Sequence, residues 1–290
     1  MSGELRGYRR SDGRLGARNH ILVLPSVVCA DQTATLIGTE KGAVAVVHQH
    51  GCGQVGDDVA HTERAFLGFA TNPNVGAVVV VSLGCETIQG RRLANLIAET
   101  GQRLEFTGIQ LMGGTANTVD RGREAVARLR TQLSQDSLVE ASLDELVLGI
   151  ATDGLGPLAE ELAAVAVEAG ARAVIAVPGS GPAVRSGTVL EQAGDGAEQH
   201  VALAGAGAQV IVSLRGPGRP AHGFATGPVV AVAGDPDIFD ALRDDFDLNG
   251  AATSADEIWR RAVAAFNGEH TASELRGARD FVLRRIARTM

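Results

Sequence analysis

Three long apolar runs in the first third of the chain constrain its fold more than any other feature. They cover residues 20–30, 42–52 and 75–86, and each is a nearly unbroken apolar stretch rich in valine. A strand with one face in water alternates between apolar and polar residues, whereas a strand buried on both faces does not. The runs therefore predict strands inside a parallel sheet that is covered by helices on both faces.

Segments with helical spacing lie between these runs and supply the crossover connections that parallel strands require. A fourth apolar run, residues 106–112, leads through two glycines into an amphipathic segment, which predicts a long helix up to residue 133. Before the first run, Asp12 and Gly13 form a dipeptide suited to a tight turn. We therefore expect a hairpin or an ordered arm at the start of the chain.

The same alternation returns in the second half of the chain. Residues 134–145, between the halves, are polar and lack a strong period, which favours a linker. A last helix is expected over residues 273–287, and apolar runs predict strands within residues 146–156, 171–181, 208–218 and 227–235. We therefore predict an α/β protein of two doubly wound, mostly parallel-sheet domains, residues 1–133 and 146–290.

The charge of the chain limits the partners that it can bind. A net charge of −8, with one lysine, Lys41, among 26 basic residues, provides no basic stripe for a nucleic-acid backbone. The first residues lack the apolar core of a signal peptide, and no window is apolar enough for a membrane span. We therefore expect a cytoplasmic protein that binds neither nucleic acid nor membrane.

Three cysteines share one position in this pattern. Cys29, Cys52 and Cys85 each lie at or just beyond the C-terminal end of one of the first three predicted strands. Sites in open parallel sheets form outside those ends, so three thiols far apart in the sequence can converge there. An odd number of cysteines does not suit a secreted disulfide framework. Thiolate and imidazole favour iron or zinc, so we expect a metal site; the alternative is three buried apolar side chains.

The second of these cysteines stands in a dense polar cluster, "HQHGCGQVGDD", residues 48–58. His48 and His50 are two positions apart, so both reach one ligand only if the chain has already turned out of the strand. One of them is a candidate ligand or base, because imidazole titrates near neutral pH, and the other would be structural. Asp57 and Asp58 are expected to stabilise the start of the next helix.

Two glycine-rich loops are candidate anion sites. In one, a strand passes into a helix, so main-chain N–H groups and a hydroxyl are available for a carboxylate or phosphate, from Gly113, Gly114 and Thr115. An ordinary turn with a threonine N-cap is equally compatible with that sequence. The other loop, "RGPGRPAHG", offers Arg215, Arg219 and His222, with a solvated surface loop as the alternative. Neither has the spacing of a dinucleotide fingerprint, which disfavours a nicotinamide-dependent oxidoreductase.

Four motifs together resemble the altronate/galactarate dehydratase family, an altronate hydrolase-like family that includes the large subunit of sulfolactate sulfo-lyase. They occur in the family's order over most of residues 7–124 and read "GYRRSDGRLGARNHILVLPSVVCA", "HQHGCGQVGDD", "TERAFLGFATNPNVGAVVVVSLGCE" and "IQLMGGTANTVDRG". The second half is similar more loosely, through "TDGLG", "RGPGRPAHGF" and "FNGEHTASELR".

The resemblance implies an iron-dependent lyase (hydro-lyase) of sugar acid metabolism. Such an enzyme removes water, or sulfite, from a small α-hydroxy carboxylate, and the product then ketonises. We expect iron, as a ferrous ion or as an iron-sulfur cluster, on Cys29, Cys52 and Cys85, with His48 or His50 as the base. Substrate contacts are expected from Arg18, Asn19, Gln54, Glu86, Gly113, Gly114, Thr115 and Arg215.

The second half departs from the family pattern. Full-length relatives carry a long segment after "AVIAVPGSG" that is missing here, and their cysteine-glycine-glycine-serine before "DGL" is reduced to "ATDGL". The first domain keeps its motifs, whereas the second is shortened. The alternative to an active lyase is therefore a non-catalytic metal- or anion-binding relative, or a subunit completed by a partner. Assembly into a homo-oligomer stays open.

Overall fold

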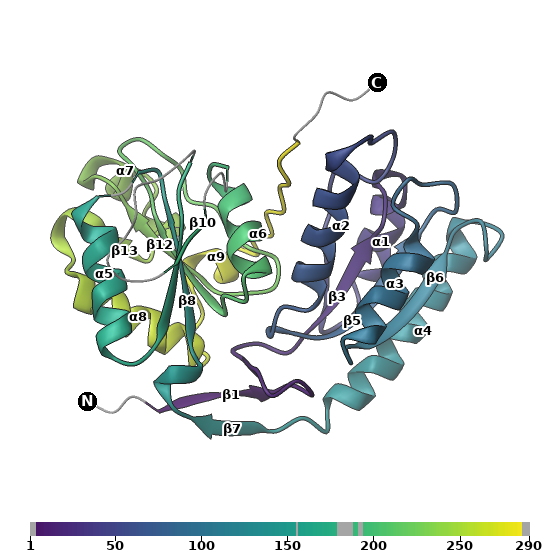
Figure 1. The fold of residues 1–290 in the computed structure, drawn as a ribbon, viewed down its shortest axis with the longest axis horizontal. Helices are drawn as coiled ribbons and strands as arrows, with labels where there is room; N and C mark the ends of the chain where they lie inside the picture. The colour runs from purple at the N-terminus through teal and green to yellow at the C-terminus, as the bar shows by residue number, and fades with distance from the viewer. Residues whose placement is uncertain (1–3, 155, 179–187, 191–193, 286–290) are drawn as a thin grey trace.

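The computed structural model describes residues 4–154, 156–178, 188–190 and 194–285. Two lobes, each built on a parallel sheet, stand side by side, and a small third sheet joins them at one end (Figure 1). Both large sheets are parallel throughout, which confirms the predicted α/β class. No helix in the described part of the chain is long and apolar enough to cross a membrane.

The first lobe contains four strands in the order β4-β3-β5-β6, namely β3 (His20–Pro25), β4 (Ala43–Ala45), β5 (Val75–Ser82) and β6 (Arg103–Gly108). All eight residues of β5 are buried, as the unbroken apolar run predicts for a central strand. Helices α1 (Asp31–Ile37) and α4 (Thr115–Leu133) cover one face, and α2 (Asp57–Ala70) and α3 (Gly90–Glu99) cover the other. A short 3-10 turn, Val28–Ala30, follows β3.

The second lobe contains six strands in the order β10-β9-β8-β11-β12-β13. They are β8 (Val147–Thr152), β9 (Arg172–Ala176), β10 (Thr188–Leu190), β11 (Val210–Leu214), β12 (Val229–Ala233) and β13 (Leu248–Asn249). Helices α5 (Pro157–Glu168) and α8 (Ala255–Phe266) pack on one face. The other helices are α6 (Ala197–Gly205), α7 (Pro236–Ala241) and α9 (Ala272–Leu275), and short 3-10 turns cover Leu143–Glu145, Arg243–Asp245 and Gly250–Ala252.

The small sheet has the order β2-β1-β7, from β1 (Leu5–Arg9), β2 (Leu15–Gly16) and β7 (Leu138–Ala141). The antiparallel pair β1–β2 confirms the predicted hairpin at Asp12 and Gly13. The polar segment 134–145, which we expected to be only a linker, contains β7 paired with β1. Its polar composition suits this position, because two of the four residues of β7 remain exposed.

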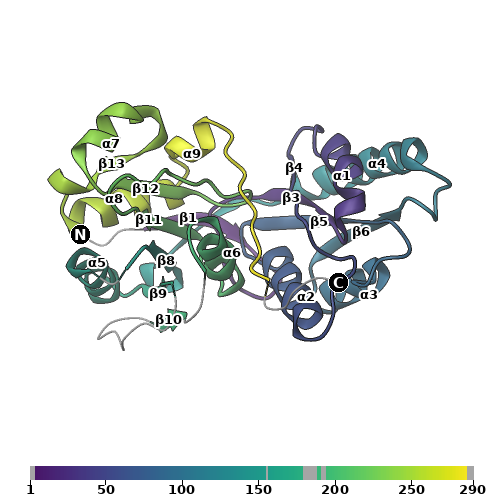
Figure 2. The ribbon, with the colours of Figure 1, turned by 90° about the horizontal axis from the view of Figure 1, so that it is seen from above.

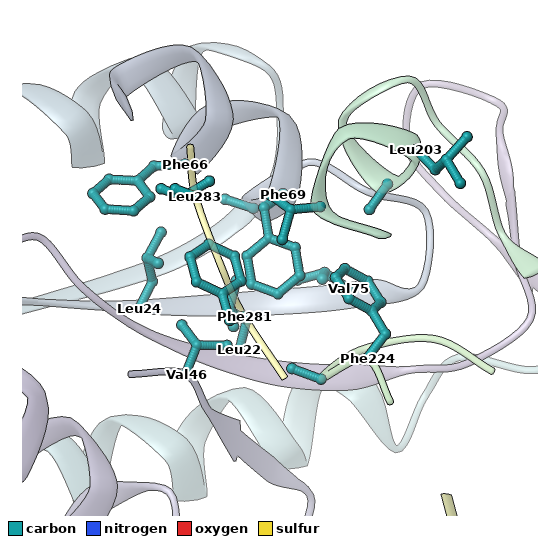
Figure 3. Packing of buried hydrophobic residues seen from close by; sticks show 14 of the residues in the cluster. Leu22, Leu24, Val46, Phe66, Phe69, Val75, Leu203, Phe224, Phe281 and Leu283 are labelled. Carbon is teal, nitrogen blue, oxygen red and sulfur yellow. The ribbon is translucent and has the colours of Figure 1, made fainter. Parts of the chain in front are cut away.

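The lobes contact each other through α2 and α6. The two helices approach closely at Gly68 and Gly205, where a Cβ on Gly68 would stand 3.0 Å from the Cα of Gly205. Nearby, the amide of Asn72 donates to the carbonyls of Ala204 and Ala208, both at 2.9 Å. One apolar cluster therefore runs from the first lobe into the second (Figure 3).

The C-terminal end of the described chain is extended, and here the helix predicted over residues 273–287 was wrong. Helix α9 ends at Leu275, and Gly277 adopts a φ of +68° that a helix does not allow. Residues 278–285 then run between the two lobes in both views (Figures 1 and 2). The remaining residues of the predicted helix, 286 and 287, lie outside the described residues.

Candidate functional site

In the first sheet the order in which strands are added reverses between β3 and β5. From β3 the chain proceeds to β4 on one side, and it later returns to add β5 on the other side. Such a switch point leaves a crevice outside the carboxyl ends of the two strands, where ligands of doubly wound proteins bind. Cys29 follows β3, and Cys85 follows β5. Two of the three cysteines therefore flank the crevice.

Main-chain hydrogen bonds join the three segments that carry the cysteines, which we call the thiol loops: residues 26–31, 48–54 and 84–90. The N–H of Val28 donates to the carbonyl of His50 at 2.9 Å. The carbonyl of Gly51 accepts from Thr87 at 2.8 Å and from Ile88 at 3.2 Å. These bonds join the three loops at one sheet edge, and all three cysteines are free and exposed. That their sulfur atoms come together there stays a prediction.

At Gly51 two of the thiol loops approach each other closely. Its φ is +92°, and a Cβ there would stand 2.1 Å from the carbonyl oxygen of Ser26 and 2.7 Å from the Cα of Val27. No side chain fits between these main-chain atoms, and the left-handed conformation favours glycine as well. Glycine beside Cys52 therefore lets the thiol loop of residues 48–54, which we call the histidine loop, lie directly on the end of β3.

Glu86 ties the third thiol loop to the first. It is 3% exposed, and its carboxylate accepts hydrogen bonds from the hydroxyl of Ser26 at 3.0 Å and from the N–H of Gly90 at 3.2 Å. The N–H of Gly84 donates to the other carboxylate oxygen. Every contact is with the protein itself, so Glu86, predicted to bind substrate, holds the loop in the structure.

His48 is fixed by its own loop. Its Nε2 lies 2.8 Å from the carbonyl of Pro25, which only accepts, so Nε2 carries the proton. Its Nδ1 then accepts from the main-chain N–H of His50 at 3.2 Å. Burial lowers the pKa of His48 from 6.5 to about 4, which keeps the ring neutral. Both nitrogens are engaged, and this arrangement suits a structural role.

The ring of His50 contacts both its own loop and the C-terminal segment. Its Nδ1 faces the amide nitrogen of Gln54 at 3.3 Å, but that nitrogen makes a shorter bond of 2.9 Å to the hydroxyl of Thr62. The ring also hydrogen-bonds to the main chain of Leu283, in the C-terminal segment. Burial and the charge of Arg285 lower the pKa of His50. Gln54 is buried too, and its carbonyl accepts from Gly51 at 2.8 Å.

Asp31 lies in the same place and was missed in the sequence. Its Oδ2 accepts from the N–H of His48 at 2.9 Å, whereas its Oδ1 is buried and has no hydrogen-bond partner among the described residues. Burial raises the pKa of this carboxyl from 3.8 to about 6. The available signal was an acid two residues after a cysteine that closes a strand. The sequence pattern of that stretch predicts only a helix, which is α1.

The chemistry of this donor set fits a thiolate-bound metal. Three exposed thiols stand on linked loops, and iron accepts thiolate ligands readily. Within residues 4–154, 156–178, 188–190 and 194–285, no three histidine, cysteine, aspartate or glutamate side chains are already grouped as a metal site. Exposed cysteine side chains rotate between rotamers at little cost, so these thiols are not locked in one orientation by packing.

The loop with Gly113, Gly114 and Thr115 lies at the same sheet edge. The N–H of Gln110, which precedes this loop, donates to the carbonyl of Leu83 at the end of β5. Both glycines have positive φ, and α4 starts at Thr115 with no side-chain cap. Free N–H groups at a helix N-terminus attract anions. The threonine N-cap alternative is wrong, because Gly114 occupies that position.

Three other predicted substrate residues lie elsewhere and are occupied by protein contacts. Arg18 and Asn19 precede β3, at the opposite edge of the sheet from the thiol loops. Arg18 pairs with Glu274 at 2.7 Å, and Asn19 accepts from Arg10 at 2.7 Å. Arg215 follows β11 in the second lobe, where it is buried and paired with Asp153 at 2.9 Å. The structure therefore does not gather these three residues with the thiol loops.

Two family models together match most of the chain. The model of the family "D-galactarate dehydratase/Altronate hydrolase, second domain" matches residues 7–134. The model "D-galactarate/Altronate dehydratase, C-terminal" matches residues 145–289.

Individual relatives match over shorter regions. Altronate dehydratase of Escherichia coli (strain K12) is 29% identical over 164 residues, which is 52% of this chain and 32% of that protein. Altronate dehydratase of Bacillus subtilis (strain 168) is 27% identical over 51% of this chain and 32% of its own length. The (2R)-sulfolactate sulfo-lyase subunit beta of Chromohalobacter salexigens is 34% identical over 41% of this chain and 30% of its own length. The matched part thus spans about a third of the length of these relatives.

Proposed function

The chain belongs to the D-galactarate dehydratase/altronate hydrolase family, and from that premise we propose that it is a lyase acting on a small α-hydroxy carboxylate. In the proposed reaction the C–H bond next to the carboxylate breaks and its proton passes to a base. The C–O bond on the neighbouring carbon breaks, and the departing hydroxide takes up a proton from the protonated base and leaves as water. In a sulfonate substrate the C–S bond would break at this carbon and sulfite would leave. The enol that remains ketonises.

One observation carries this proposal: three exposed thiols on hydrogen-bonded loops at the switch point of a parallel sheet. A purely structural domain gains nothing from exposed cysteines at that edge, because a free thiol packs better when it is buried. Cys29, Cys52 and Cys85 would hold iron, which when bound supplies a Lewis acid for the oxygen atoms of the substrate.

The chain's own groups supply the rest of the proposed site. Both histidine rings are hydrogen-bonded, and we assign the base to His50 because its Nδ1 contact with the Gln54 amide, at 3.3 Å, is longer than either ring contact of His48, at 2.8 and 3.2 Å. The Nδ1 of His50 has only the longer of the two contacts that Gln54 makes. The N–H groups at the start of α4 would bind the substrate carboxylate. Asp31 keeps the loop close to α1 through the N–H of His48.

Loading the protein with iron under anaerobic conditions tests the proposed metal ligands before any substrate is known. The purified chain is incubated with ferrous iron, and bound iron and acid-labile sulfide are measured. We expect iron to bind, and Cys29→Ser, Cys52→Ser and Cys85→Ser each to lower its amount. Val167→Ser, an exposed position in the second lobe, serves as the control. Unchanged iron binding in all three cysteine variants would refute the ligand assignment.

A panel of hydroxy acids then tests the reaction. Uronate-derived acids, tartrate-like acids and sulfolactate are offered to the iron-loaded chain, with detection down to about 10⁴-fold below a turnover of roughly 10 s⁻¹. We expect a 2-oxo acid product from one class, and Cys52→Ser to abolish it. Iron binding without any product would support the second candidate instead.

The second candidate is a subunit that a partner completes. Two observations favour it. One relative is named as a subunit beta, and three exposed apolar side chains lie within five positions of Cys29 or Cys52 in the sequence, namely Val28, Val47 and Val55 at 39%, 53% and 40% exposure. Co-purification of the native complex from its source, followed by the same substrate panel, would separate this candidate from a chain that acts alone.

A further inference from the structure

The C-terminal segment, residues 280–285, crosses from the second lobe to the thiol loops. We call it the strap. At its beginning, the carboxylate of Asp280 accepts from the N–H of Gly223 at 2.8 Å and lies 3.7 Å from Nδ1 of His222. Both partners belong to the glycine-proline loop after β11. In Figures 1 and 2 the strap then passes between the lobes beside α2.

The strap packs into the first lobe by the alternation of an extended chain. Phe281 and Leu283 are both 7% exposed, whereas Val282 between them is 44% exposed. The ring of Phe281 lies 4.8 Å from the ring of Phe69 and 6.4 Å from that of Phe66, between centroids. Figure 3 shows these side chains in one cluster. Burying two large side chains anchors the strap firmly.

Every residue from 48 to 50 has a contact with the strap. The ring of His48 lies 6.2 Å from that of Phe281, between centroids. The carbonyl of Gln49 accepts from the guanidinium of Arg285. The ring of His50 hydrogen-bonds to the main chain of Leu283. A segment that is remote in the sequence thus contacts the histidine loop at three successive positions, two residues before Cys52.

The geometry points to the strap as a positioning element of the site: Phe281, Leu283 and Arg285 hold the histidine loop and fix the tautomer of His50. A main-chain carbonyl only accepts, so the ring nitrogen that contacts Leu283 carries the proton. Nδ1 faces Gln54, which leaves Nε2 for Leu283 and keeps the lone pair on Nδ1. This inference rests on the lyase activity proposed above.

The first test reads the tautomer directly, without turnover. In metal-free protein labelled with ¹⁵N-histidine, we expect His50 to show one protonated nitrogen and one unprotonated nitrogen, assigned by comparison with His50→Gln. In Phe281→Leu and in Arg285→Ala the two nitrogen shifts should move toward each other, and exchange of the amides of residues 48–52 should speed up about tenfold. Val282→Ala, on the outward side of the strap, should match the native protein.

A second comparison separates positioning from simple loss of stability. Phe266→Leu removes similar volume from the core of the second lobe. It should lower the midpoint of unfolding about as much as Phe281→Leu does, while the shifts of His50 and the exchange of residues 48–52 stay native. If Phe281→Leu and Arg285→Ala both leave the His50 shifts and the loop exchange unchanged, or if Phe266→Leu alters them equally, the strap has no positioning role.

Kinetics complete the test once a substrate is found. For Phe281→Leu we expect kcat to fall about 10- to 100-fold with little change in KM, and for Val282→Ala neither constant to change. A native kcat alongside altered His50 shifts would keep the strap as an anchor of the loop but remove His50 from the reaction. Failure of the whole panel with native protein would overturn the lyase proposal and leave the spectroscopic result intact.

Discussion

The hydroxyl of Ser26 donates a 3.0 Å hydrogen bond to the carboxylate of Glu86, although 60 positions separate them in the chain. Ser26 directly follows β3, and Glu86 lies just beyond β5. The same carboxylate accepts from the N–H groups of Gly84 and Gly90. One buried acid therefore holds together the two strand ends between which the candidate site lies.

Replacing Glu86 with Gln should loosen this edge. The amide group of Gln would turn an N–H toward donors that now meet a carboxylate oxygen, so at least one buried donor loses its partner. We expect a loss of about 2 kcal/mol in the free energy of unfolding, measured by urea denaturation. Glu99→Gln, at the exposed end of α3, is the matched control. Equal stability of the two variants would contradict this role of Glu86.

The candidate site could be located from sequence because it depends on strand order. Three consecutive buried runs that form a parallel sheet end at one sheet edge, and hydrogen bonds join the loops that follow them and carry the cysteines. The roles of neighbouring residues could not be predicted in the same way. Glu86 and Gln54 appeared to be free polar groups, whereas their partners, Ser26, Gly90 and Thr62, become neighbours only after folding.

Gly51 should tolerate no side chain, whereas Gly53, two positions away, should tolerate one. Both have positive φ, but a Cβ on Gly53 meets nothing within 4 Å, and one on Gly51 meets the main chain of Ser26 at 2.1 Å. We expect Gly53→Ala to cost about 1 kcal/mol of stability through backbone strain alone. Gly51→Ala should cost about 3 to 5 kcal/mol and speed the reaction of Cys52 with a maleimide. Similar costs for both variants would show that the loop does not rest on β3.

Packing between the lobes should depend on which glycine of the helix crossing is replaced. A methyl group on Gly68 would press on the Cα of Gly205 at 3.0 Å, and main chain does not swing aside. Gly68→Ala should therefore cost about 1 to 3 kcal/mol. A Cβ on Gly205 meets nothing within 4 Å, so Gly205→Ala should be neutral or slightly stabilising through its helix propensity. Thermal unfolding of both variants measures the two costs. A larger loss of stability in Gly205→Ala than in Gly68→Ala would show that α2 and α6 do not pack at Gly68 as described.

The strap shows where local sequence patterns fail. Residues 273–287 have helical spacing, yet Gly277 ends the helix, and the next residues extend to bury Phe281 and Leu283 against Phe69. The partner surface comes from a helix more than 200 positions earlier in the chain. Tertiary burial outweighs local propensity here, and single-sequence periodicity contains no information about that surface.

His200 should make the second lobe sensitive to acid. It is fully buried, its Nδ1 donates to the carbonyl of Gly223 at 3.0 Å, and its Nε2 lies 3.3 Å from the hydroxyl of Ser213. The pKa of His200 is lowered from 6.5 to about 4, mainly by burial and to a smaller extent by the charges of His222 and Arg215, whereas the hydrogen bond to Gly223 and the charge of Asp280 oppose this. Between these two pH values the unfolded chain binds a proton that the native chain does not.

The stabilisation linked to His200 is therefore complete above pH 6.5 and is lost as the pH falls toward 4, by up to about 3 kcal/mol. We expect urea midpoints of the native protein to fall over this range. In His200→Gln the midpoint should start lower at pH 7, because the bond to Gly223 is lost, and then change less with pH. His270→Gln replaces an exposed histidine and should keep the pH dependence of the urea midpoint that the native protein shows. The pKa of His48 is also lowered to about 4. Its protonation on unfolding therefore leaves some dependence of the urea midpoint on pH in every variant. A pH dependence that is identical in His200→Gln and the native protein would mean that this buried imidazole does not govern acid unfolding of the second lobe.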